Sequence, residues 1–90
     1  MVRIELPLDE WVIVLSGTTD GVINLGNYPA DIKKQCVYRI YEGINTPNDA
    51  ESVTVRLMSG TEPNRTITMN NSTPTNVYVK AITQNGYAIV

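Results

Sequence analysis

The chain has 90 residues, no histidine and a single cysteine, Cys36. Histidine is the usual proton-transfer group near neutral pH, and histidine and cysteine are the usual ligands of zinc. Without histidine, a Ser-His-Asp or Cys-His catalytic arrangement is excluded. Cys36 cannot form an internal disulfide, and its place beside Val37 in an apolar stretch indicates a small buried hydrophobic residue rather than a nucleophile. We therefore expect function to lie on a surface rather than in a catalytic pocket.

Charge and long apolar runs are also scarce. Charged residues make up 18% of the chain and the net charge is −2, which gives no electrostatic attraction to phosphate backbones. Nowhere do about eighteen apolar residues run together, as a membrane helix requires, and residues 1–7 lack the continuous apolar segment of a signal peptide. We expect a soluble protein made in the cytoplasm, with neither a nucleic acid nor a membrane as partner.

The apolar residues, 42% of the chain, fall in short bursts separated by Gly, Pro, Asn and Ser. Val53, Val55 and Leu57 alternate with polar residues, which is typical of a strand with one buried face. The pattern predicts strands at residues 3–6, 11–16, 21–25, 35–42, 52–58, 65–69, 76–83 and 87–90. Strands at this spacing predict an all-β fold, a single small sandwich or barrel of about seven to eight short antiparallel strands. Residues 11–90 form its one domain, and residues 1–10 form either an N-terminal arm or an edge strand.

Local signals add detail between these strands. Asn85-Gly86 suits a type I′ turn and predicts a C-terminal hairpin. Residues 28–34 and 46–51 could each form one or two helical turns, the second with Thr46 as N-cap. The strand at 76–83 carries apolar bulk on both faces, which suggests that its outer face is also covered by something.

Acidic residues raise two chemical alternatives. Glu42, Asp49 and Glu51 are close in sequence, but glycoside hydrolysis needs two acids held across a cleft that so small a domain rarely encloses. Residues 18–20 and 48–51 offer oxygen ligands of the kind calcium accepts, without the spacing of an EF-hand loop. Solvated loop charges and Asx turns explain both groups. We expect no enzyme activity, no metal and no cofactor.

Aromatic residues are the remaining candidates for a binding surface. Trp11 precedes an apolar run, so it either caps one end of the core, which we favour, or anchors a partner. Tyr38 and Tyr41 are three positions apart on one predicted strand and must therefore take opposite faces. At least one of these two tyrosines is expected on the outside.

Three stretches carry a family resemblance: EWVIVLSGTTDGVINLGN (10–27), YRIYEG (38–43) followed by a proline-containing loop, and VYVKAITQNGYAIV (77–90). Together they resemble a group of small bacteriophage virion proteins. The resemblance implies a protein that decorates or cements the capsid, or forms an accessory part of head fibres or tails, without catalytic residues. It also implies a virion location after synthesis in the host cytoplasm. The partners would be the major capsid protein, sibling subunits in a homo-oligomer, or both.

We therefore expect a non-enzymatic virion structural protein, a capsid decoration protein, that binds through exposed apolar and aromatic side chains. The expected contact residues are Arg3, Ile4, Trp11, Tyr28, Tyr38, Tyr41 and Tyr87. The alternative is a carbohydrate-binding or adhesion module, as in a head-fibre or tail accessory protein, in which aromatic rings stack on sugars. An exposed, coplanar pair of aromatic rings would favour that alternative.

Overall fold

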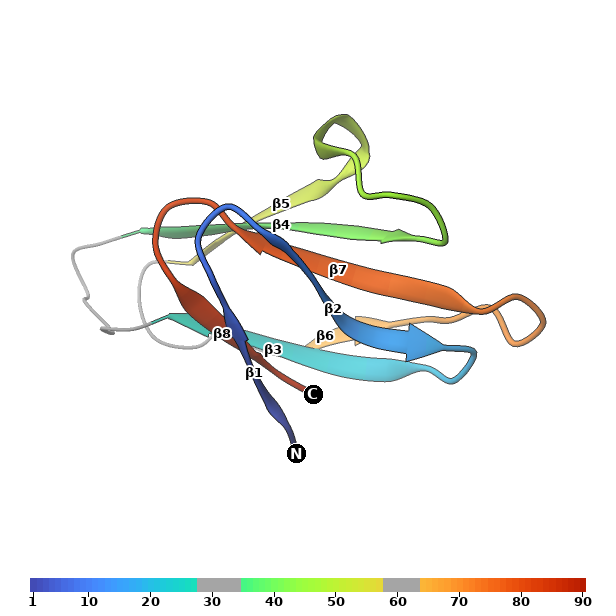
Figure 1. Cartoon of the computed structure of the whole chain (residues 1–90). Coiled ribbons are helices and arrows are strands. Elements are labelled where there is room, and N and C mark those ends of the chain that lie inside the picture. Colours follow the sequence, from blue (N-terminus) through green and yellow to red (C-terminus); the bar gives the residue numbers. More distant parts are fainter. Residues whose placement is uncertain (28–34, 58–63) are drawn as a thin grey trace.

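The computed structural model describes residues 1–27, 35–57 and 64–90, and these residues confirm the all-β prediction. Within these described ranges, eight strands and one short 3₁₀ helix follow one another (Figure 1). They are β1 (Arg3–Leu6), β2 (Trp11–Gly17), β3 (Gly21–Asn27), β4 (Cys36–Gly43), η1 (Asp49–Glu51), β5 (Val53–Leu57), β6 (Arg65–Ile67), β7 (Thr75–Ala81) and β8 (Gly86–Ile89).

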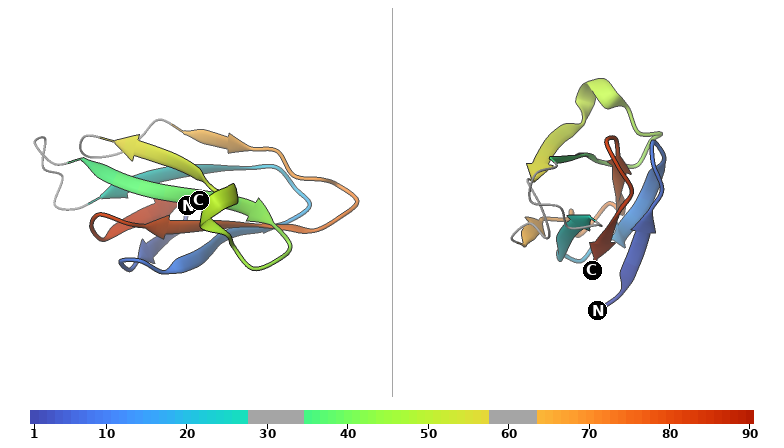
Figure 2. Two further views of the ribbon diagram at one scale, coloured as in Figure 1. Left: turned by 90° about the horizontal axis from the view of Figure 1, so that it is seen from above. Right: turned by 90° about the vertical axis from the view of Figure 1, so that its left-hand side faces the viewer.

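The strands form two four-stranded antiparallel sheets, ordered β1-β8-β3-β6 and β2-β7-β4-β5, which pack face to face (Figures 1 and 2). Among the described strands, β4 and β5 are the one pair of sequence neighbours that hydrogen-bond to each other. The other successive strands belong to different sheets, and the first strand pairs with the last. This strand order is that of an eight-stranded jelly roll, a form of β-sandwich.

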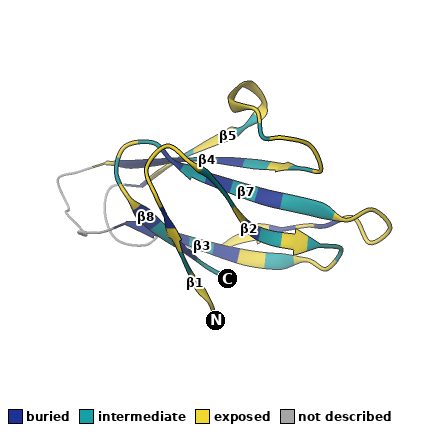
Figure 3. Ribbon diagram, viewed as in Figure 1, coloured by how far each residue is buried: buried dark blue, intermediate teal, exposed yellow. Residues whose placement is uncertain are grey.

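The core fills the space between the sheets with the inward-facing side chains of alternate strand positions. Along β7, buried and partly exposed residues alternate (Figure 3). The hydrophobic residues with no more than 2% exposure come from both sheets: Leu6, Ile23, Leu25, Cys36, Tyr38, Ile40, Ile67, Val77, Val79, Ala81 and Ala88. Cys36 is thus the buried hydrophobic residue that its apolar surroundings predicted.

A hydrogen bond between the sheets crosses this core. The Tyr38 hydroxyl, on β4, donates to the carbonyl oxygen of Gly26, on β3. Gly86 makes room for it, because a Cβ at that position would collide with the Tyr38 hydroxyl oxygen. Burial raises the pKa of Tyr38, so the buried hydroxyl keeps its proton and remains a donor.

The predicted C-terminal hairpin at Asn85-Gly86 is wrong. β7 and β8 lie in different sheets, so the residues between them cross from one sheet to the other. Neither Asn85 nor Gly86 has the positive φ that a type I′ turn requires. Gly86 instead packs against the Tyr38 hydroxyl, and β8 pairs with β1 and β3. These contacts override the local turn preference.

The predicted helical turn near 46–51 is present, with a different cap. It is the three-residue helix η1, and its N-cap is Asn48, whose side-chain oxygen accepts a hydrogen bond from the Ala50 N–H at 2.9 Å. Thr46 lies before the cap. The other helical prediction, residues 28–34, falls outside the described residues.

Residues 3–6 form the edge strand β1 rather than an arm. β1 pairs with β8 from Arg3 opposite Ile89 to Leu6 opposite Gly86. Val2 and Val90 extend the pairing through two backbone hydrogen bonds of 2.7 and 2.9 Å. Leu6 is 1% exposed, which ties this strand into the core.

Candidate binding surface

Aromatic and apolar side chains gather on the outer face of the sheet β2-β7-β4-β5. The register places Trp11, Lys80 and Arg39 in one row across β2, β7 and β4. Ile13, Tyr78 and Tyr41 form the next row. Their sequence neighbours on these strands face the core, so alternation turns both rows outward. We call this set the aromatic face: Trp11, Ile13, Arg39, Tyr41, Tyr78 and Lys80.

The apolar row of this face is continuous across three strands. The Tyr41 and Tyr78 ring centroids are 6.1 Å apart, and the ring planes are tilted by 48°. Ile13, on the far side of Tyr78, is 49% exposed. The Asn76 side-chain amide lies within 3.3 Å of the Tyr78 hydroxyl and donates a hydrogen bond to it. Three neighbouring strands span about 10 Å, so the row is wide enough to act as one contact patch.

The second row is organised around Lys80. Its ammonium group lies 5.2 Å from the centroid of the Trp11 ring, a cation–π distance. It also lies 3.3 Å from an Asp49 carboxylate oxygen and 3.4 Å from one of Asp9. Arg39 donates a hydrogen bond to the backbone carbonyl of Asp49 at 3.3 Å. The loop that carries η1 is thereby held beside the aromatic face, and the cationic side chains are fixed in position.

Two predicted contact residues, Trp11 and Tyr41, come together on this face. Trp11 is half-buried and lies outside the core, which corrects the interpretation that we favoured from the sequence. Tyr41 faces outward and Tyr38 inward, as their spacing required. Tyr78 was missed as a contact residue, although the apolar bulk on both faces of its strand was the signal that could have identified it.

Arg3 and Tyr87 lie on the outer face of the opposite sheet. The Arg3 guanidinium carbon is 4.0 Å from the centroid of the Tyr87 ring. Tyr87 in turn covers Gly26, where a Cβ would approach the ring to 2.6 Å or less. These two predicted contact residues are therefore separated from Trp11 and Tyr41 by the thickness of the sandwich.

The remaining predicted contact residues do not form a surface. Tyr38 has no exposed area, so its assignment as a contact residue is wrong: it is a core residue that joins the sheets. Ile4 packs against the core from β1 and is only partly exposed. Tyr28 lies outside the described residues.

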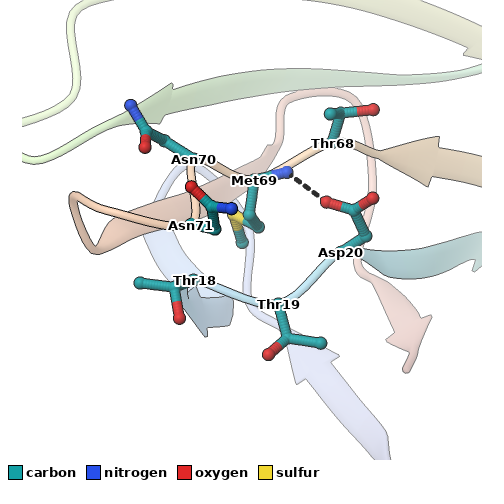
Figure 4. A pocket seen from close by; sticks show the side chains of 7 residues that line it. All are labelled: Thr18, Thr19, Asp20, Thr68, Met69, Asn70 and Asn71. Carbon is teal, nitrogen blue, oxygen red and sulfur yellow. Dashed lines mark hydrogen bonds between the residues drawn. The ribbon is translucent and has the colours of Figure 1, made fainter.

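An open hollow of about 630 Å³ lies at one end of the sandwich, between the β2–β3 turn and the chain that follows β6 (Figure 4). Its lining residues are Thr18, Thr19, Asp20, Thr68, Met69, Asn70 and Asn71. The Asp20 carboxylate accepts a hydrogen bond from the Met69 backbone N–H at 2.7 Å, and Figure 4 shows this bond joining the two segments. Asp20 is the one acid in the lining and is engaged in holding the two segments together, so the hollow does not present the acid pair of a glycosidase.

The other acidic residues considered from the sequence are exposed. Asp49 is paired with Lys80, and Glu42 and Glu51 are exposed to solvent. Within residues 1–27, 35–57 and 64–90, no three His, Cys, Asp or Glu side chains gather where they could hold a metal ion. The same residues include no helix of the length and apolar character needed to cross a bilayer.

Comparison with models of known protein families, with curated proteins and with solved structures finds no match to this chain.

Proposed function

We propose that the protein is a non-enzymatic structural component of a bacteriophage virion, a decoration protein that attaches to the capsid through the aromatic face. The observation that carries the proposal is the outward row Ile13–Tyr78–Tyr41 on a sandwich whose core is already filled by other residues. Tyrosine and tryptophan are enriched among the residues that dominate protein–protein binding energy.

Two further points support this proposal. The sequence resembles small phage virion proteins, and the jelly-roll strand order is one that occurs in viral capsid and lectin domains. A shared fold alone does not determine function, so the argument depends on the aromatic face. An interface of about 800 Å² per partner is sufficient for stable attachment, and many copies on a lattice add avidity.

The carbohydrate-binding alternative is less well supported by the geometry. Stacking on a flat sugar ring would be favoured by coplanar aromatic rings, whereas Tyr41 and Tyr78 are tilted by 48°. At this tilt the two rings do not form one flat platform on which the apolar face of a sugar could stack.

The test is co-sedimentation with capsids of the encoding phage that were assembled without this protein. We expect Tyr41→Ala and Tyr78→Ala each to weaken attachment at least about tenfold, because each truncates an anchor of the patch. Both should change the melting temperature little, since neither side chain belongs to the core. Tyr87→Ala is the matched control, because it makes the same chemical change on the opposite sheet.

Three outcomes would contradict the proposal. One is saturable attachment that all three variants retain equally. Another is a loss of attachment that only follows a loss of folding. The third is retention on immobilised polysaccharide that Tyr41→Ala abolishes, without any attachment to capsids, and this outcome would identify the carbohydrate-binding module.

A further inference from the structure

We propose that two copies of the chain pair through the free edge of β5, antiparallel about a two-fold axis at Val55. This inference names the contact between sibling copies and rests on the proposed function for its biological setting. It starts from the four edge strands of the two described sheets: β1, β6, β2 and β5.

Three of these edges carry features that discourage pairing with another chain. β1 places the charged side chains of Arg3 and Glu5 on its outer face. β2 has an irregular register between Ile13 and Leu15, as a β-bulge produces. β6 is only three residues long.

The edge of β5 differs from these three. β5 runs in unbroken register with β4 from Val53 to Leu57, and none of its five residues is a proline. Its other side pairs with no described strand. A regular strand of this kind leaves a row of backbone N–H and C=O groups available to a further strand.

The inner face beside this edge is also incompletely covered. Val53 points to the core side of the sheet together with Val55 and Leu57, yet it is 51% exposed. On this side of the sandwich the opposite sheet ends in β6, which is three residues long (Figure 2). A strand added to β5 would bring apolar side chains next to Val53 and remove part of that surface from water.

The sequence of β5 identifies a second copy as the partner. In an antiparallel pair centred on Val55, Val53 of each copy lies opposite Leu57 of the other, and Thr54 lies opposite Arg56. Apolar residues then meet apolar residues on the inner face, and no two like charges face each other on the outer face. A two-fold contact of this kind requires a self-complementary segment, which Val-Thr-Val-Arg-Leu provides.

Pairing would join two four-stranded sheets into one sheet with β5 strands at its centre. The two β7 strands would then be five strand spacings apart, about 24 Å, so two aromatic faces would lie side by side on one surface. A single strand pair buries less area than a standard interface, so we expect weak association in solution. Simultaneous attachment of both faces to a lattice would strengthen it.

The test is sedimentation velocity of the isolated protein at micromolar to millimolar protein concentrations. The wild type is compared with variants substituted at Thr54. Thr54 is exposed on the outer face and would lie opposite Arg56 of the second copy. Thr54→Lys creates two like-charge pairs per dimer and should weaken dimerisation about tenfold, whereas Thr54→Glu creates two opposite-charge pairs and should strengthen it. Thr66→Lys, the same change on exposed β6, should leave dimerisation unchanged. Melting curves establish that each variant is folded.

A wild-type protein that stays monomeric throughout this range overturns the inference. So do Thr54→Lys and Thr54→Glu variants that dimerise as the wild type does, because the contact would then lie elsewhere. Capsid attachment is measured in parallel: a monomeric protein that still binds capsids leaves the proposed function standing, and a dimer that does not bind them leaves the β5 contact standing.

Discussion

Tyr38 is fully buried, and its hydroxyl makes the hydrogen bond between the two sheets. A substitution at this position therefore tests how much that bond stabilises the fold. Tyr38→Phe keeps the ring and removes the hydroxyl that bonds to the Gly26 carbonyl. Because that carbonyl would remain buried without its partner, we expect the free energy of unfolding to fall by about 1–3 kcal/mol. Urea unfolding at neutral pH measures this. Tyr41→Phe, on the half-buried outer face, is the control and should change stability by less than about 0.5 kcal/mol; equal losses would show that the inter-sheet hydrogen bond contributes nothing.

The raised pKa of Tyr38, caused mainly by burial, predicts sensitivity to alkaline pH. In the unfolded chain a tyrosine ionises near pH 10, so above that pH the unfolded state releases a proton that the folded state retains. The contribution to stability is complete below about pH 10 and declines as the pH rises further. We expect the wild-type stability to decline more steeply than that of Tyr38→Phe above pH 10, by a difference approaching about 1.4 kcal/mol per pH unit. The measurement is the free energy of unfolding of both proteins from pH 8 to pH 11. Parallel curves of stability against pH for the wild type and Tyr38→Phe would contradict the prediction.

At this scale the sequence predicted that Tyr38 and Tyr41 face opposite ways but not which one faces the core. The parity of a strand determines the first point. The second was ambiguous because Cys36, Val37 and Ile40 place apolar residues on both faces of the same strand. In the structure Tyr38 is the inward-facing tyrosine, and Gly86 leaves room for its side chain because it has no Cβ.

At the scale of elements, β1 offers a direct test of whether residues 3–6 belong to the isolated fold. Leu6, on the strand beside β8, is almost fully buried in the core between the sheets. Leu6→Ala should therefore lower the free energy of unfolding of the monomer by about 2–4 kcal/mol through lost burial and a residual cavity. Glu5→Ala, at the exposed neighbouring position, should stay within about 0.5 kcal/mol. If both substitutions left the thermal or urea stability of the monomer unchanged, the segment would not be a strand of the fold in solution.

Strand positions were predictable from the sequence, whereas strand partners were not. Short apolar bursts bounded by Gly, Pro, Asn and Ser located all eight strands to within a few residues. Asn85-Gly86 shows the limit of local reasoning. The dipeptide indicates only the turn type that it favours locally. In the fold β8 pairs with β1 and β3 and does not fold back on β7.

At the scale of the whole molecule, the aromatic face depends on the sheet order. Trp11, Tyr41 and Tyr78 come from three strands that are distant in sequence and adjacent only because the order is β2-β7-β4. Such non-local pairing cannot be inferred from periodicity, which explains why Trp11 was assigned to the core and Tyr78 was overlooked. The composition favoured a surface over a catalytic centre, because the chain has no histidine, and this stays a prediction.

The hydrogen bonds between Val2 and Val90 have a practical consequence for engineering. Both residues belong to the layer that faces away from Trp11, Tyr41 and Tyr78. A fluorescent protein or enzyme inserted next to either residue would lie on the side opposite the aromatic face and would leave that face unobstructed.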